Sequence, residues 1–143
     1  MIKTYLEFIE TYSGAIYLIT RSIMVAFAFF RAFEDFKLIR DGIRPNHFNN
    51  GLHTFLVVGV LMLFNSVQGL FYDMVSYFVI YWVVFDYFLN RFRELPYYYT
   101  GVKEEPDSDD NALTDRFLNW VGDKAGFIIK LVLLVVFNLL AGL

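Results

Sequence analysis

The chain has 143 residues, of which 57% are hydrophobic and 20% aromatic, and only 19% are charged. Soluble domains average about 25% charged residues, so this apolar surface exceeds what one soluble core of this size can bury. The net charge of −3 argues against nucleic-acid binding, and the absence of cysteine excludes disulfides, thiolate metal sites and thiol catalysis.

The first predicted elements are a short interfacial helix over residues 1–12 and a membrane span over 13–30. Apolar residues recur at helical spacing in the first segment, and only Arg21 interrupts the second. The helix is expected to continue beyond the span and to stop near Asp41–Gly42, with Pro45 marking the break. A cleavable signal peptide is the alternative for this region, but Arg21 and the acidic residues before the span fit it poorly.

The second and third predicted spans cover residues 52–72 and 74–92. The second has 21 residues with His53 as its one ionisable side chain, and a helix of about 20 residues crosses the hydrocarbon core. A tight turn at Gly69–Asp73 is expected to connect it to the third span, which carries Asp86.

The remaining elements are a polar loop over residues 94–116 and a last span over 122–143. The loop is acidic and interrupted by proline, which is typical of solvated segments. A short amphipathic stretch, residues 113–121, is expected to lie at the membrane interface before the last span, which Lys130 interrupts. The pattern predicts an all-α fold: one domain over residues 1–143, forming an integral membrane bundle of four transmembrane helices with short interfacial helices.

The distribution of cations predicts the orientation of this bundle. The connection between the first two spans and the loop between the last two together carry nine Lys and Arg residues, against one on the other side; these are Arg31, Lys37, Arg40, Arg44, Arg91, Arg93, Lys103, Arg116 and Lys124, against Lys3. Because cytoplasmic loops are enriched in cations, both loops are predicted in the cytoplasm and both termini outside it.

One ionisable residue interrupts each predicted span: Arg21, His53, Asp86 and Lys130. At about 1.5 Å per residue from the loop ends of the spans, Asp86 lies roughly 9 Å deep and Lys130 roughly 8 Å, with Arg21 nearer the middle. A carboxylate in hydrocarbon is strongly unfavourable unless it is paired. We therefore predict an intramembrane polar cluster of these four residues with Asn90, in which Asp86 pairs with Lys130 or Arg21 and holds the helices together.

A metal site at the same leaflet is the sharper alternative. Imidazole and carboxylate groups are ligands of Zn²⁺ and Mn²⁺, and His47, His53 and Asp86 are the candidates, with Asp115 near them. The two histidines are six residues apart, however, so one helix does not present them on one face, and no HExxH motif is present. The prediction is therefore no catalytic residue, no metal and no cofactor.

A longer pattern extends over residues 85–118: Phe85-Asp86, Asn90-Arg91, then Leu95-Pro96-Tyr97-Tyr98-Tyr99-Thr100-Gly101, and Asp115-Arg116-Phe117-Leu118. This pattern resembles one in uncharacterised short multi-pass membrane proteins of bacterial and phage genomes. The resemblance implies a multi-pass membrane protein and brings no activity with it.

Three functions are compatible with these features. The favoured one is a non-enzymatic membrane protein whose helices pack in a homo-oligomer or a larger membrane complex, to which the G-x-x-x-G at Gly122–Gly126 lends support. Its predicted partners are the lipid bilayer and copies of itself or other membrane subunits, and not nucleic acid. The alternatives are an intramembrane metal-dependent hydrolase at the cytoplasmic leaflet and an oligomeric ion or proton conduit, in which Asp86 titrates along a polar path through Arg21, Asn65 and Gln68.

Overall fold

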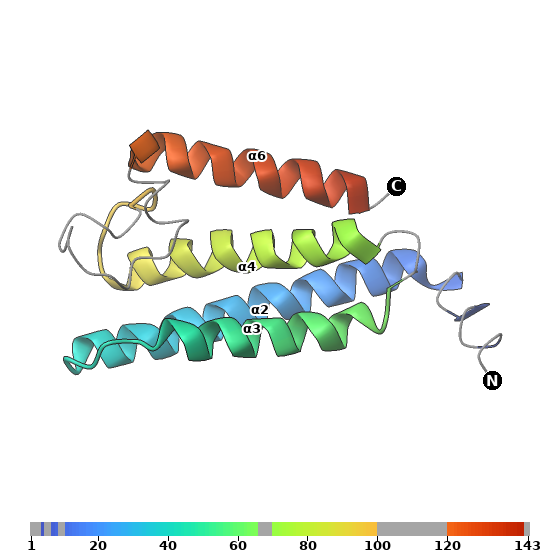
Figure 1. Cartoon of the computed structure of the whole chain (residues 1–143), viewed down its shortest axis with the longest axis horizontal. Coiled ribbons are helices and arrows are strands. Elements are labelled where there is room, and N and C mark those ends of the chain that lie inside the picture. The colour runs from blue at the N-terminus through green and yellow to red at the C-terminus, as the bar shows by residue number, and fades with distance from the viewer. Residues whose placement is uncertain (1–3, 5–6, 9–10, 66–69, 100–119, 142–143) are drawn as a thin grey trace.

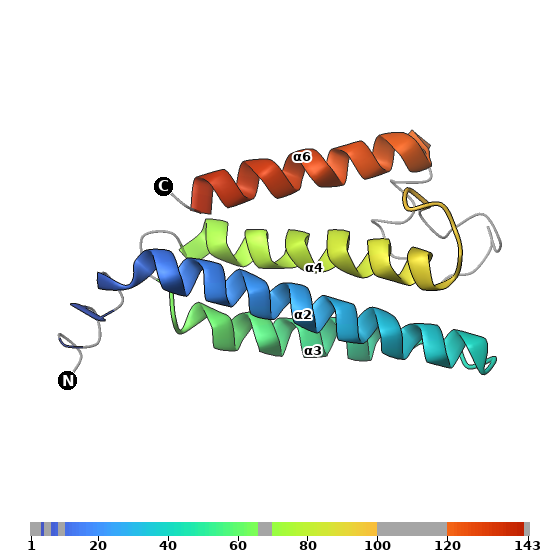
Figure 2. The same cartoon turned by 180° about the vertical axis from the view of Figure 1, so that it is seen from behind.

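The computed structural model of the chain describes residues 4, 7–8, 11–65, 70–99 and 120–141, without the side chain of His47. Its helices are α2 (Ser13–Arg40), α3 (His47–Met62), α4 (Leu70–Phe92) and α6 (Asp123–Ala141). They lie side by side along their lengths, with α4 between α6 on one side and the pair α2 and α3 on the other (Figure 1). Seen from behind, α2 lies in front of α3 (Figure 2). The described chain is therefore all-α, as predicted.

Two of these helices meet the length and composition that a membrane span requires. They are α2, with 28 residues, and α6, with 19. Helix α3 is apolar but has 16 residues, which corresponds to about 24 Å at 1.5 Å per residue. The predicted second span over residues 52–72 was therefore wrong in extent, because the helix there begins at His47 and ends at Met62.

The first helix ends where the sequence predicts. Gly42 adopts a positive φ of 73°, its N–H donates to the Ile39 carbonyl (3.0 Å), and the Ile43 N–H donates to the Leu38 carbonyl (2.8 Å). This is the Schellman arrangement, which satisfies the last carbonyls of a helix and favours glycine at this position. The next helix then begins with a cap, since Asn46 Oδ1 accepts a hydrogen bond from the Asn49 N–H (3.2 Å).

The turn after α3 differs from the prediction. Residues 63–65 form tight turns whose N–H groups donate to carbonyls three residues earlier, as from Asn65 to Met62 (3.3 Å), and this geometry ends an α-helix. Residues 66–69 are outside the described chain, so the predicted role of Gly69 is not described. Asp73 does not belong to the turn, because it lies in the first turn of α4.

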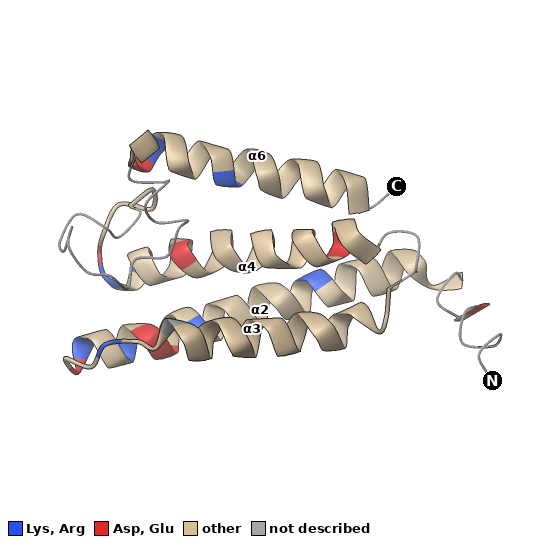
Figure 3. Cartoon of the chain, viewed as in Figure 1, with Lys and Arg blue, Asp and Glu red and all other residues tan. Residues whose placement is uncertain are grey.

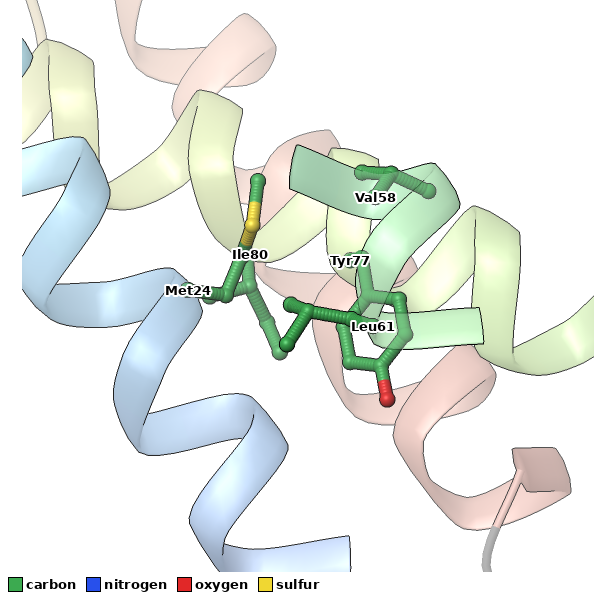
Figure 4. Packing of buried hydrophobic residues seen from close by; sticks show 5 residues of the cluster. All are labelled: Met24, Val58, Leu61, Tyr77 and Ile80. Carbon is green, nitrogen blue, oxygen red and sulfur yellow. The ribbon is translucent and has the colours of Figure 1, made fainter. Parts of the chain in front are cut away.

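The interior of the bundle contains as many polar as apolar residues. Among the described residues, nine buried side chains are hydrophobic and nine are polar or charged. The apolar set includes a cluster in which α2, α3 and α4 meet, formed by Met24, Val58, Leu61, Tyr77 and Ile80 (Figure 4). Many of the exposed residues on α2, α3 and α6 are large and hydrophobic, among them Leu18, Phe55 and Leu139. This distribution is inverted relative to a soluble helical bundle, which buries its apolar faces and exposes polar ones.

Several predicted elements lie outside the described residues. These are most of the interfacial helix over residues 1–12, most of the polar loop over 94–116, the amphipathic stretch over 113–119, and Asp115. Gly122, at the start of the predicted G-x-x-x-G, adopts a positive φ of 84° directly before α6. It thus marks the helix start, while Gly126 is buried inside the helix.

Candidate functional site

A buried ion pair joins α2 to α4 near the ends of these helices that are remote from the charged loops. Arg21 Nη2 donates to Asp73 Oδ1, and the two side chains are only 10% and 7% exposed. The Arg21 guanidinium also lies 3.5 Å from the centre of the Tyr17 ring, where the ring face attracts the cation. Both charges are therefore removed from solvent and compensated within the bundle.

Further contacts extend this pair to α6 and to the turn after α3. The Tyr77 hydroxyl accepts from Arg21 Nη1 (3.4 Å) and from Asn65 Nδ2 (2.8 Å). On α6, Asn138 accepts at its side chain from Ser76 Oγ (2.9 Å) and at its carbonyl from the Tyr17 hydroxyl (2.9 Å). We call this set the Arg21 network: Tyr17, Arg21, Asn65, Asp73, Ser76, Tyr77 and Asn138. It connects α2, α4 and α6 with Asn65 in the turn after α3.

A second ion pair joins α4 to α6 nearer the loop end. Lys130 Nζ donates to Asp86 Oδ2, with the side chains 4% and 28% exposed. The ammonium group also lies 4.4 Å from the centre of the Trp82 ring. The two residues stand six and seven positions from the loop ends of their helices, Phe92 and Asp123, so their depths match, as the sequence indicates.

A third group of charged and polar side chains lies between α2 and α3. Arg31 Nη2 donates to Asn50 Oδ1, and Asn50 Nδ2 donates to Asp35 Oδ2 (2.6 Å). Arg31 also pairs with Glu34 and lies 3.9 Å from Asp35 Oδ1. The Thr54 hydroxyl donates to the Asn50 carbonyl (2.8 Å). Asp35, Asn50 and Thr54 are buried, so this group fixes α3 against α2.

The predicted polar cluster is therefore only partly brought together. Asp86 meets Lys130, but Arg21 pairs with Asp73, which is 13 residues from Asp86 along α4 and so about 20 Å away at 1.5 Å per residue. Met24 and Ile80 belong to the apolar cluster beside Tyr77. His53 is exposed on α3, and its side chain does not join either ion pair.

Asn90, the fifth residue of the predicted cluster, binds the segment that follows α4. Its side chain is buried, and Nδ2 donates to the Tyr99 carbonyl (2.7 Å). This hydrogen bond holds the segment after α4, which turns back toward α6. There the Tyr97 ring meets the Phe127 ring, with 5.1 Å between the centroids. Asn90 therefore positions the chain after α4 against α6, on the same pair of helices that Asp86 and Lys130 connect.

The proposed metal ligands do not assemble within the described chain. No group of three His, Asp or Glu side chains there lies close enough to hold a metal ion. His53 is exposed and Asp86 pairs with Lys130, while the His47 side chain and Asp115 are outside the described residues. The two candidates whose side chains are described, His53 and Asp86, therefore belong to no such group.

Asp73 and Asn138 are among the site residues that sequence reasoning missed. The depth of Arg21 was counted from Phe30, the loop end of the predicted span, although α2 continues to Arg40. Counted from Ser13, Arg21 is eight residues from the opposite end, and Asp73 is three residues from that end of α4. The two depths differ by five residues, so a count along the chain does not identify this pair.

These features define the class: an all-α protein in which polar networks are buried between four described helices, two of them long and apolar enough to cross a membrane. No protein-family model, curated protein or solved structure matches the chain. The resemblance drawn from residues 85–118 accordingly stays a prediction.

Proposed function

We propose that the chain is a multi-pass integral membrane protein without enzymatic activity, which acts by packing its helices against copies of itself or other membrane subunits. The observation that carries this proposal is the inverted bundle: charged pairs inside, and large apolar side chains on the outward faces of α2, α3 and α6. Lipid chains are suitable neighbours for such faces, whereas water is not. In this proposal all four helices cross the bilayer, the shorter α3 included.

The proposed orientation places both termini outside the cytoplasm and the loop over residues 94–116 inside. It is supported by the charge distribution over the described chain, in which the exposed Lys and Arg residues of the helices and their connections gather at the loop end of the bundle (Figure 3). Among them are Lys37, Arg40, Arg91 and Lys124. Cations are retained on the cytoplasmic side during insertion.

Cysteine labelling tests this orientation, because the native chain has no cysteine. Ser13→Cys and Asp41→Cys stand at opposite ends of α2, which is about 42 Å long at 1.5 Å per residue. A membrane-impermeant maleimide should label Ser13→Cys in intact cells and Asp41→Cys only after the cells are permeabilised. Labelling of both from one side would contradict a membrane-spanning α2.

The proposed association is supported by glycines on the outward face of α3. A Cβ built on Gly51 or Gly59 would meet no atom within 4 Å. Small residues on lipid-facing positions allow another helix to approach closely. These positions are therefore suited to a contact with a second membrane helix.

Gly59→Leu should abolish self-association without damaging the fold, since the new side chain enters open space. In a mild detergent, light scattering should give an oligomer for the native chain and a monomer for Gly59→Leu, with equal helix content by circular dichroism. Val132→Leu on the exposed face of α6 is the matched control and should keep the native mass. An unchanged mass for Gly59→Leu would exclude this face from the contact.

The two alternative functions receive no specific support. The hydrolase requires a group of metal ligands, which the described residues do not form. The conduit requires continuity between the Arg21 network and Asp86. The member of the network nearest to Asp86 on α4 is Tyr77, nine residues or about 14 Å away, and apolar residues such as Met24 and Ile80 pack beside it. Gln68, on the predicted path, is outside the described residues.

A further inference from the structure

The seam between α2 and α4 is lined with aromatic rings at its loop end. Phe29 meets Phe88 edge to face, with 4.9 Å between ring centroids, and Phe92 meets Phe33 at 5.6 Å and Phe36 at 5.7 Å. Part of this aromatic set faces outward, since Phe30 is 62% exposed, Tyr87 43% and Phe33 37%. The seam thus offers an apolar surface that is not covered by the described chain.

Each of the two helices places an exposed cation one turn beyond an exposed ring of this seam. On α2 the residues are Phe33 and Lys37, and on α4 they are Tyr87 and Arg91; residues four apart share a helix face. The two helices run in the same direction (Figures 1 and 2), so in both cases the ring is deeper in the bundle and the cation nearer the loop end.

The two cations also belong to one continuous surface. Lys37 Nζ lies 4.4 Å from the centre of the Phe33 ring. Ring contacts run from Phe33 through Phe92 and Phe88 to Tyr87, the residue one turn before Arg91. Within the part of the chain that the structure describes, neither Lys37 nor Arg91 forms an ion pair, in contrast to Arg21, Arg31, Arg40 and Lys130. This end of the seam therefore carries two positive charges that form no ion pair with a described side chain.

We propose that this seam binds an anionic phospholipid of the cytoplasmic leaflet. The phosphate lies between Lys37 and Arg91, and an acyl chain runs along Phe30, Phe33 and Tyr87 toward the middle of the bilayer. An anionic amphiphile matches both parts of the surface, because the cations attract the headgroup and the rings cover the hydrocarbon. The inference rests on the proposed insertion in a membrane.

Native mass spectrometry of the detergent-solubilised full chain tests this proposal. Phosphatidylglycerol should be retained at least about ten-fold more strongly than phosphatidylcholine. A cation near the membrane surface contributes about 1 kcal/mol to attraction of anionic lipid, or roughly five-fold in affinity. Lys37→Gln and Arg91→Gln should therefore each weaken phosphatidylglycerol binding about five-fold, and the double variant about thirty-fold.

Arg93→Gln is the matched control. It removes the same charge two residues from Arg91, on a different side of the chain, and Arg93 likewise has no ion pair among the described residues. Its binding of phosphatidylglycerol should stay within about two-fold of the native value. An equal loss for Arg93→Gln and Arg91→Gln would show a diffuse charge effect and overturn the site.

Two further measurements show whether the phosphate alone or the phosphate together with the acyl chains accounts for the binding. Glycerol phosphate, which has the headgroup chemistry without acyl chains, should bind far more weakly than the lipid, and Tyr87→Ser should weaken the lipid only. Glycerol phosphate binding as tightly as phosphatidylglycerol would overturn the lipid assignment. Alkaline carbonate extraction of membranes distinguishes the two proposals: release of the chain refutes membrane insertion, whereas a retained chain that binds both lipids equally refutes the seam alone.

Discussion

Asp73→Asn is expected to lower the free energy of unfolding by about 3–5 kcal/mol, because it leaves one member of a buried ion pair without its counter-charge. Arg21 is 8% exposed, and a guanidinium group keeps its proton inside a protein. The charge would therefore remain in the apolar interior, held only by the Tyr17 ring, Thr20 and Tyr77. Unfolding in mixed detergent micelles, followed by circular dichroism, measures the change.

Three further variants show whether this loss of unfolding free energy comes from the Arg21–Asp73 ion pair. Arg21→Met should also lower stability, since it leaves the buried Asp73 carboxylate without its counter-charge. The double variant should be more stable than Asp73→Asn alone. Arg40→Met is the control: the Arg40–Asp41 pair is 61% and 55% exposed, and its loss should change stability by no more than about 0.5 kcal/mol. A loss for Asp73→Asn as small as that of Arg40→Met would contradict a stabilising role.

The sequence was sufficient to predict the features that depend on local chemistry. The end of α2 follows from Gly42, which tolerates a positive φ, and from Pro45, which cannot continue a helix. The contact between Asp86 and Lys130 follows from matched depths in antiparallel neighbours and from the high cost of an isolated charge in hydrocarbon. Both features follow from the residue types and their positions along the chain alone.

Features that depend on tertiary contacts were not predictable in the same way. The apolar run continues past Met62 through Leu63 and Phe64, and no glycine or proline marks the end of α3. The end becomes intelligible only once Asn65 is seen to bind the Tyr77 hydroxyl on α4. Hydropathy does not show whether residues 63–65 form a turn or continue α3, because an apolar sequence is compatible with both.

The partner of Arg21 is a second feature that the sequence alone does not predict. Its depth depends on which end of α2 is taken as the reference, and the helix is 28 residues long rather than the 18 of the predicted span. Hydropathy places the apolar stretch but does not show how the extended helix lies against its neighbours. Only the packing of α2 on α4 decides that Asp73, and not Asp86, faces Arg21.

Asp86→Asn is the second substitution with a large expected effect, again about 3–5 kcal/mol of unfolding free energy. It leaves the ammonium group of Lys130, whose side chain is 4% exposed, between α4 and α6 without its carboxylate. Lys130→Met should also lower stability, because it leaves the Asp86 carboxylate without its ammonium partner inside the membrane.

The double variant Asp86→Asn with Lys130→Met should recover part of the loss, since it removes the stranded charge along with its partner. Asp86→Asn combined with Arg21→Met should show no recovery, because Arg21 belongs to the other ion pair about 20 Å away along α4, and the two losses should add. Unfolding in mixed micelles compares all four variants. If Asp86→Asn instead keeps native stability and abolishes a measurable activity of the protein, the pair is not structural. Asp86 is then a functional carboxylate, and the proposal of a protein that acts through helix packing alone must be abandoned.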